Sequence, residues 1–421
     1  MSGKRRDKKG RVLRTGETQR TDGQYMFRYV DPTGKRKVVY SWRLVNTDKV
    51  PEGKRCKAAL RDLEQQIQRD LSDGIRSADA DSMTVNDLFQ SFMDLRTDLR
   101  ETSRISYRNI YQRHVAPVLG EKQIGAVRAS DVKKLYIDMI QTQKLQPATV
   151  RIVHAVLYQV FETAALDNII RVNPASTVLK SLRKILDNET KKRHALTEEE
   201  QRIFVDYVYA SERHRRFGPL ITVLLGTGMR IGEALGLRWD DIDFDNNTIS
   251  VNHILIYNRW ESGNHEYRIS PPKTSAGTRL IPMFADVKRI LLAEQQKPRQ
   301  HHEDCTIDGY TNFVFVNRNG TVFSQPHIFW VLRSIVTDYN EEEIDNAAQE
   351  DREPVLLPMI SAHILRHTFC TRLCENESNI KIVQDIMGHK SIQTTMDVYN
   401  EATAVKKQAS FKELDGKIKL T

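Results

Sequence analysis

The stretch GTGMRIGEALGLRW occupies residues 226–239, and SAHILRHTFCTRL occupies residues 361–373. The first contains Arg230 and the second contains Arg366, which stands three residues after His363 on a predicted helix, so that both side chains point to one face. Glu233 follows Arg230 by three residues and is expected to orient its guanidinium. Around both stretches, the sequence mixes predicted helices with predicted strands.

Two further segments in this half of the chain contain polar residues that are candidates for a catalytic site. PPKTSAGTRLIP (271–282) has Lys273 near the tip of a predicted hairpin. IMGHKSIQTTMDVY (386–399) has a Gly-His pair at His389 and ends, ten residues later, in Tyr399. A single tyrosine or lysine indicates little, since most are ordinary surface or core residues.

The order of the signals is more informative than any one of them. Gly-x-Arg-x-x-Glu, a hairpin lysine, His-x-x-Arg beginning at His363, Gly-His and a closing tyrosine follow one another along the chain. With these motifs the chain resembles the tyrosine recombinase, or phage integrase, family across residues 197–405. The resemblance implies six active-site residues: Arg230, Lys273, His363, Arg366, His389 and Tyr399.

The implied chemistry explains the residue types. DNA cleavage without a metal needs a protein nucleophile, and the Tyr399 hydroxyl can attack phosphorus to leave a 3′-phosphotyrosine. Arg230 and Arg366 would clamp the attacked phosphate with permanently charged, paired donors. The phosphotyrosine stores the bond energy, so we expect no cofactor.

The remaining polar residues are expected to handle protons and phosphate oxygens. His363 would donate to the phosphate or help to deprotonate Tyr399. His389 would hydrogen-bond a phosphate oxygen, and Lys273 would protonate the departing 5′-oxygen.

The N-terminal region carries the positive charge of the chain. Residues 1–74 hold 19 basic and 10 acidic residues, an excess that equals the net charge of +9 for all 421 residues. Residues 1–20 are interpreted as a mobile basic arm, followed by strands in QYMFRYV and KRKVVYSWRLV and a helix over 56–71. We predict a small α+β domain, a three-stranded sheet with one helix. Its charge suits nucleic acid, and a solubilising tail is the alternative.

Such a sheet, laid in a DNA groove, would offer Arg28 and Tyr40 to the bases and place Arg20 and Lys54 on phosphates. The alternative is that the aromatic residues of this region simply form its core. In the helical region, four residues are candidates for major-groove contacts, although a solvated helix face explains them equally well: Arg104, Arg108, Arg151 and His154.

The rest of the chain completes a three-domain interpretation. An all-α domain over 82–176 resembles the core-binding domain of the family, with helices starting at Thr84, at Thr102 or Ser103, at Ser130, and with Pro147 in a first turn. Residues 72–82 and 177–196 are predicted linkers. A mixed, mainly α catalytic domain covers 197–405, with a capping box at Thr197 and an acidic surface insertion at 341–354. The tail, 406–421, is expected to dock on a neighbouring subunit.

Some classes of protein and site are disfavoured. No stretch approaches eighteen apolar residues, and the N-terminus lacks the apolar core of a signal peptide, so we expect neither membrane nor secretion. Four cysteines are too few for a disulfide scaffold, and a reducing bacterial cytoplasm is expected. Cys370 and Cys374 are interpreted as packing residues. His301, His302, Asp304 and Cys305 lack a second ligand pair at fixed spacing, so no metal is predicted.

The layout resembles the integrases of conjugative transposons most closely. That resemblance implies integration and excision of a mobile element through a four-way junction. The implied partners are double-stranded DNA at core and arm sites, three further copies of the chain in a tetramer on two duplexes, and a small excisionase or a host DNA-bending protein. Two alternatives stay open, a type IB topoisomerase-like relaxing enzyme and a non-catalytic DNA-binding regulator.

Overall fold

The structure is a computed structural model that describes residues 5–31, 34–55, 58–186, 194–260, 262–272, 275–298 and 305–400. The chain divides into two compact units, Met1–Lys191 and Lys192–Thr421, and each is described by itself. Within the described residues, no helix is both long and apolar enough to cross a membrane.

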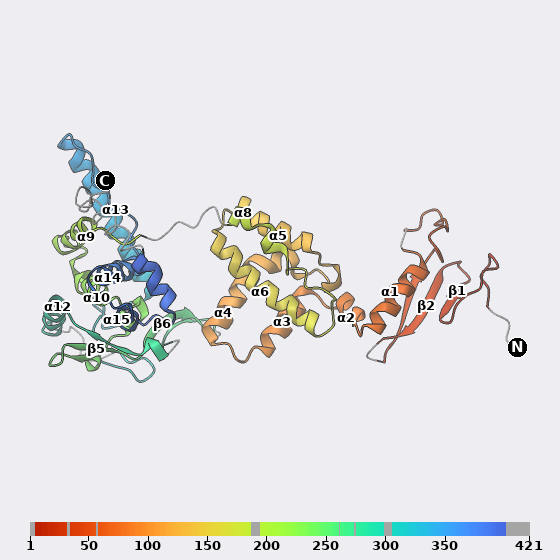
Figure 1. Ribbon diagram of the computed structural model, residues 1–421, viewed down its shortest axis with the longest axis horizontal. Coiled ribbons are helices and arrows are strands. Elements are labelled where there is room, and N and C mark those ends of the chain that lie inside the picture. The colour runs from red at the N-terminus through yellow and green to blue at the C-terminus, as the bar shows by residue number, and fades with distance from the viewer. Residues whose placement is uncertain are drawn as a thin grey trace, which may run out of the picture. The chain divides into compact units, whose positions relative to one another are not determined.

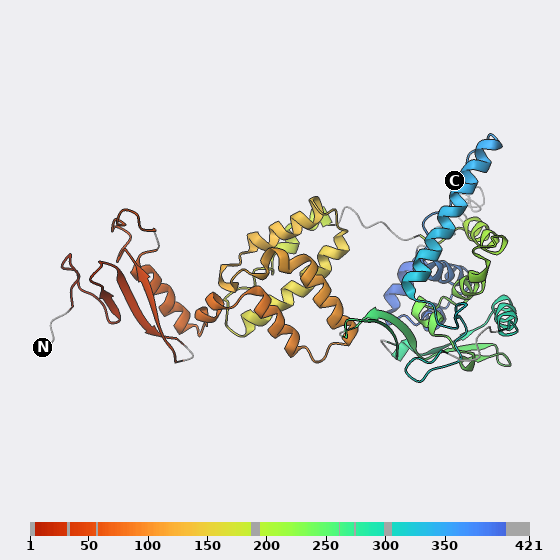
Figure 2. The ribbon, with the colours of Figure 1, turned by 180° about the vertical axis from the view of Figure 1, so that it is seen from behind.

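The first unit begins with the predicted three-stranded sheet. Strands β1 (Glu17–Gln19), β2 (Tyr25–Val30) and β3 (Arg36–Ser41) are antiparallel and lie in the order β1-β2-β3. Helix α1 (Leu60–Ser72) lies alongside β2 in both views (Figures 1 and 2). Tyr25, Phe27, Leu44 and Leu60 form the core between them. The prediction of an α+β domain is confirmed.

The prediction of a mobile arm over residues 1–20 is wrong for its described part. Strand β1 belongs to this segment, and Asp7, near the start of the segment, is buried. Asp7 accepts from Arg11 Nε at 2.8 Å and from the Tyr25 hydroxyl at 3.0 Å, and Arg11 also donates to Asp48 at 2.9 Å. The carboxylates of Asp7 and Asp48 thus hold Arg11, one of the basic residues that composition alone assigns to a free arm.

A helical bundle follows in the same unit, as predicted for an all-α domain. Thr84 caps the helix after it, and Pro147 stands in a first turn. Buried apolar residues line the inner faces of the helices. The helices are α2 (Ser77–Ser82), α3 (Val85–Leu95), α4 (Glu101–Ile110), a wider π-helix (Tyr111–Gly120), a short 3₁₀ turn (Ile124–Ala126), α5 (Ala129–Gln141), α6 (Pro147–Leu166), α7 (Val178–Ser181) and α8 (Arg183–Leu186).

Two linker predictions and two cap predictions are wrong here. Residues 77–82 form α2 and bury Ala80, while α7 and α8 bury Val178 and Leu186 within the predicted second linker. Each of these polar segments contains a few apolar residues that pack into the bundle. The average polarity of the segment does not reveal them. The caps are Arg100 for α4 and Arg128 for α5, in place of the predicted hydroxyl residues.

The described residues of the second unit mix helices with two small sheets. One sheet has the order β4 (Ile242–Asp243), β5 (Thr248–Val251), β8 (Arg279–Pro282), and the other pairs β6 (Ile254–Arg259) with β7 (His265–Ser270).

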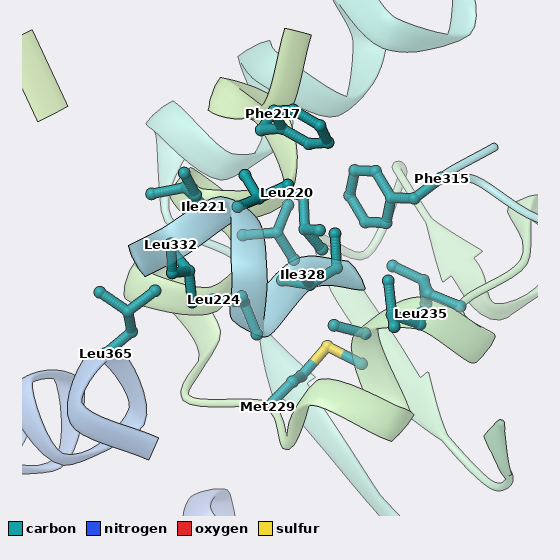
Figure 3. Close-up of a cluster of buried hydrophobic side chains, with 14 of the residues drawn as sticks. Phe217, Leu220, Ile221, Leu224, Met229, Leu235, Phe315, Ile328, Leu332 and Leu365 are labelled. Carbon is teal, nitrogen blue, oxygen red and sulfur yellow. The ribbon is translucent and has the colours of Figure 1, made fainter. Parts of the chain in front are cut away.

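The helices of this unit pack around a core. Its labelled members include Leu224 from α10 (Gly218–Thr227), Met229 from the loop after α10, and Leu365 from α14 (Ala362–Asn376) (Figure 3). Residues 392–400 are also helical. The other helices are α9 (Glu198–Ala210), α11 (Ile231–Gly236), α12 (Ala285–Gln295), α13 (Gln325–Gln349) and α15 (Ile380–Met387), with 3₁₀ turns at Arg215–Phe217, Trp239–Asp241 and Ser275–Gly277.

Thr197 caps α9 through the predicted capping box, whereas two other local predictions fail. The predicted surface insertion at 341–354 is largely the end of α13, which buries Ala347 and pairs Glu343 with Arg352. The predicted hairpin around the lysine is also wrong as a pairing, because β7 pairs with β6 and β8 pairs with β5.

Candidate active site

Arg230 is placed by the junction between α10 and α11. Helix α10 ends at Gly228, whose φ of 62° is left-handed, and α11 begins after Arg230 as its N-cap. Glu233, whose side chain is 1 % exposed, accepts from the backbone N–H of Arg230 and from its Nη1, both at 2.8 Å. The predicted contact between Glu233 and Arg230 is therefore present.

Arg366 lies on α14, where Ser361 caps the helix by accepting from the Ile364 N–H. The side chain is buried, and its two terminal nitrogens donate to the carbonyls of Gly228 and Met387, both at 2.5 Å. Burial, reinforced by the positive charge of Arg230, lowers the pKa of Arg366 to about 9. A buried cation of this kind is stabilised by an anion, which a DNA phosphate can supply.

A third arginine joins this cluster, and the sequence reasoning missed it. Arg279, at the start of β8, donates from Nη2 to Glu233 at 2.9 Å and from Nε to the Ile386 carbonyl at 2.7 Å. Arg279 lies in the segment PPKTSAGTRLIP (271–282), six residues after Lys273. A basic residue opening a short strand gave the available signal, and only the fold pairs it with Glu233.

The three arginines converge on the C-terminal end of α15. The carbonyls of Ile386, Met387 and Gly388 accept from Arg279, Arg366 and Arg230 respectively, at 2.7, 2.5 and 3.1 Å. The last carbonyls of a helix lack partners within the helix and carry partial negative charge, so cations are favoured there. This contact fixes the segment that leads into His389.

His389 is held immediately after this helix end. Its Nδ1 lies 3.0 Å from the Thr395 hydroxyl, and its backbone carbonyl accepts from Gln384 Nε2 at 3.0 Å. Burial, followed by the charges of Arg366, Arg230 and Arg279, lowers the pKa of His389 to about 4. The imidazole is therefore neutral near pH 7. When Nδ1 accepts from Thr395, the ring proton sits on Nε2, which is then free to donate to a phosphate.

The nucleophile candidate, Tyr399, is half-buried and packs against a cluster under α14 and α15. The cluster contains Phe369, Val383 and the two cysteines that were predicted to be packing residues, Cys370 and Cys374, both of which are buried.

His363 is exposed in the first turn of α14 and borders a surface groove shared with Ile231, the neighbour of Arg230. Lys273 lies outside the described residues. The structure thus brings Arg230, with its partner Glu233, and Arg366 together at the end of α15, immediately before His389.

The DNA-contact candidates of the sheet lie on its outer face. Arg28 and Tyr40 occupy the side opposite the core, because Arg28 pairs with Val38 and Met26 pairs with Tyr40 across the strands. The Arg20 guanidinium lies 5.7 Å from the Tyr40 ring centroid, and Lys54 Nζ lies 5.2 Å from the centroid of Trp42.

The four candidates of the helical bundle are all half-buried. His154 Nδ1 lies 3.1 Å from the buried Tyr136 hydroxyl, and burial lowers the pKa of His154. Arg151 donates to the Leu186 carbonyl at 3.3 Å. Arg104 and Arg108 lie on α4. Their packing is compatible with a solvated helix face as well as with DNA contact.

No group of three or more metal-ligating side chains occurs in the part of the chain that the structure describes. Of the four residues considered for a metal, Cys305 is described and half-buried, and the other three lie outside the described residues.

Three parts of the chain match known protein families. It matches the phage integrase family over residues 194–405, the DNA-binding domain of Tn916 integrase over residues 1–71, and the SAM-like N-terminal domain of phage integrases over residues 84–140.

The similar proteins span nearly all of the chain. The transposase from transposon Tn1545 of Streptococcus agalactiae is 34 % identical over 419 residues, covering 99 % of this chain and 98 % of the relative. The transposase from transposon Tn916 of Enterococcus faecalis is 33 % identical with the same coverage. The integrase of transposon Tn1549, solved with transposon right end DNA, is 30 % identical, with a TM-score of 0.67 over 79 % of this chain and all of that one. This chain belongs to the phage integrase family of tyrosine recombinases, enzymes that cleave and rejoin DNA.

Proposed function

We propose that this chain integrates and excises a mobile element of the conjugative transposon type, through a 3′-phosphotyrosine and a four-way junction. The observation that carries the proposal is the convergence of Arg230 and Arg366 on the end of α15, which suits a phosphate and lies immediately before His389 and ten residues before Tyr399. Relatives named for transposons Tn1545 and Tn916, and a Tn1549 integrase solved with circular intermediate DNA, support the kind of element.

In the cleavage step, the Tyr399 oxygen bonds to phosphorus and the bond from phosphorus to the 5′-oxygen breaks. Arg230 and Arg366 stabilise the charge that develops on the phosphate oxygens. Neutral His389 donates to one of these oxygens, and His363 donates to another or takes the tyrosyl proton. Lys273 gives a proton to the departing 5′-oxygen. A 5′-hydroxyl of partner DNA then reverses the same chemistry.

The proposal assigns residues 1–74 to arm sites, 82–176 together with the packed helices α2, α7 and α8 to core sites, 197–405 to catalysis and 406–421 to a tail that docks on a neighbouring subunit. Double-stranded DNA is the substrate. Four copies would act on two duplexes, with an excisionase or a DNA-bending protein setting direction. The outer face of the sheet, with Arg20, Arg28, Tyr40 and Lys54, supports arm-site binding through exposed basic and aromatic groups. Arg104, Arg108, Arg151 and His154 would face the core site.

A nicked suicide substrate tests the chemistry. It carries the joined ends of the mobile element, and cleavage releases a short strand so that the covalent protein–DNA adduct accumulates. Wild-type protein should form the adduct, Tyr399→Phe should bind the same DNA without forming it, and Arg230→Ala or Arg366→Ala should slow it at least ~10²-fold. Absence of a wild-type adduct would show that the protein is a non-catalytic binder.

Synapsis separates recombination from simple relaxation. A recombinase should bring two labelled core-site duplexes into one complex of four subunits, which native gels or mass photometry can detect. An enzyme that relaxes supercoiled DNA as a monomer on a single duplex, without forming this complex, would be topoisomerase-like instead.

A further inference from the structure

Arg279 is buried beside the other two arginines and makes four hydrogen bonds to the protein there. Its side chain is 5 % exposed. Nε donates to the Ile386 carbonyl at 2.7 Å, Nη1 to Glu233 Oε1 and the Gly277 carbonyl at 3.2 Å each, and Nη2 to Glu233 Oε2 at 2.9 Å. Four of its five N–H donors bond to protein and the side chain is buried, so Arg279 is not a group that contacts DNA.

Glu233 lies between two guanidinium groups of different exposure. Its carboxylate accepts from Arg230 on one side and from Arg279 on the other, and the side chains of Arg230, Glu233 and Arg279 are 41 %, 1 % and 5 % exposed. Arg230 is therefore the outer partner, open to an incoming phosphate, and Arg279 is the inner one. The pKa of Glu233 is lowered, since the bonds and charge of Arg279, followed by those of Arg230, outweigh the effect of burial. The carboxylate is ionised.

An ionised, buried carboxylate beside Arg230 would compete with the DNA phosphate for the charge of that arginine. Arg279 supplies a second positive charge to the same carboxylate at 2.9 Å. With Arg366, the network holds three arginines and one glutamate, a net charge of +2. The attacked phosphate approaches a charge of about −2 in the transition state, so this balance matches it. Without Arg279, only +1 remains.

We propose that Arg279 is a positioning residue of the cleavage reaction. It neutralises Glu233, so that Arg230 keeps its charge for the scissile phosphate, and the same guanidinium fixes the Ile386 carbonyl ahead of His389. This inference rests on the proposed function, because it concerns the rate of phosphotyrosine formation.

A rescue experiment tests the charge argument. Single-turnover adduct formation on the nicked substrate is measured for wild type, Arg279→Met, Glu233→Gln and the double variant Arg279→Met/Glu233→Gln. Arg279→Met should slow the adduct at least ~10²-fold while leaving the DNA dissociation constant unchanged, because Arg279 does not reach DNA. The double variant restores a net charge of +2 and should recover at least ~10-fold of that loss.

The pair Arg352 and Glu343 provides a matched control in the same unit. This arginine also donates twice to one glutamate, at the far end of α13. Arg352→Met, with or without Glu343→Gln, should leave the rate of adduct formation unchanged.

The outcomes separate cleanly. If the wild type forms no adduct, the proposed function is wrong. If the wild type forms it and Arg279→Met forms it equally fast, only the inference about Arg279 is wrong. A folded double variant as slow as Arg279→Met would also overturn it, since a purely structural arginine gives no charge rescue. Should Arg279→Met fail to fold, the double variant decides alone. Having lost both buried charges, it should fold, and cleavage within about tenfold of wild type is expected.

Discussion

Arg366 donates to the carbonyl of Gly228 at 2.5 Å, across 138 residues of sequence. The bond joins α14 to the loop that presents Arg230, and the other arm of the same guanidinium reaches the Met387 carbonyl. In turn, Arg230 donates to Gly388. Both glycines have a φ of 62° and end a helix, so each places its carbonyl where the opposite arginine can reach it. Two left-handed glycines thus align the two arginines of the proposed phosphate clamp.

Replacing Gly388 with alanine should impair cleavage more than folding. A Cβ there would lie 2.8 Å from the Ala276 carbonyl oxygen, in a left-handed conformation that costs an alanine about 1–2 kcal/mol. Relief of the clash should move the Gly388 carbonyl away from Arg230, and we expect adduct formation to fall at least ~10-fold. The control is Gly309→Ala, which has a φ of 81° but nothing within 4 Å of its Cβ. Equal adduct rates for the two variants would contradict the alignment role.

Replacing Arg366 with lysine should not preserve activity. An ammonium cannot reproduce the planar fork that reaches two carbonyls at once, so the α14–α15 junction loosens and the clamp loses its alignment. Adduct formation should fall ~10²-fold. Arg372→Lys, on the same helix and bonded to the Leu196 carbonyl, should change it by less than about threefold. A lysine variant at 366 that cleaves like wild type would show that charge alone suffices.

The sequence predicted those parts of the site that depend on local spacing. Glu233 and Arg230 stand three apart at the start of a helix, and His363 and Arg366 share α14, so periodicity found both pairs. Arg279 stands 46 residues from Glu233, and no local pattern joins them. The spacing of residues in the sequence also could not show that three successive carbonyls at the end of α15 face three arginines. That arrangement depends on how β8, α11 and α14 pack.

Composition misled where polar segments bury a few residues. The acidic stretch 341–354 suggested a solvated insertion, yet Glu343 accepts from Arg352 and from the Val355 N–H while Ala347 is buried. Residues 1–20 suggested a free arm, yet Asp7 and Glu17 are buried against arginines. In both segments, paired charges and a few buried side chains stabilise the folded conformation. Average hydropathy does not reveal such interactions.

His389 should make the free energy of unfolding decrease as pH falls from about 6.5 towards 4. Burial and three arginines lower its pKa to about 4 in the folded chain, against about 6.5 when unfolded. Between these values the unfolded chain binds a proton that the folded chain does not, so this contribution is complete above about pH 6.5 and is lost as pH falls towards 4. His389→Gln should flatten the pH dependence of the free energy of unfolding, measured with urea across this window. His265→Gln, at an exposed strand position, should not. Identical slopes for wild type and His389→Gln would contradict the prediction.

Arg28 should contribute one phosphate or base contact at arm-site DNA. It is exposed on the outer face of the sheet, one diagonal step from Tyr40, on which Arg20 stacks. Neutralising a phosphate releases counterions, so in the full-length chain Arg28→Ala should weaken binding to an arm-type duplex, obtained by selection from random sequence. If Arg28 contacts a phosphate, the slope of log affinity against log salt should also fall by about one. If it reads a guanine, affinity should fall mainly for duplexes that carry that base. Arg69→Ala removes another exposed arginine, on α1, and serves as the control. Equal affinity and equal slopes for wild type and Arg28→Ala would place DNA on another face of this domain.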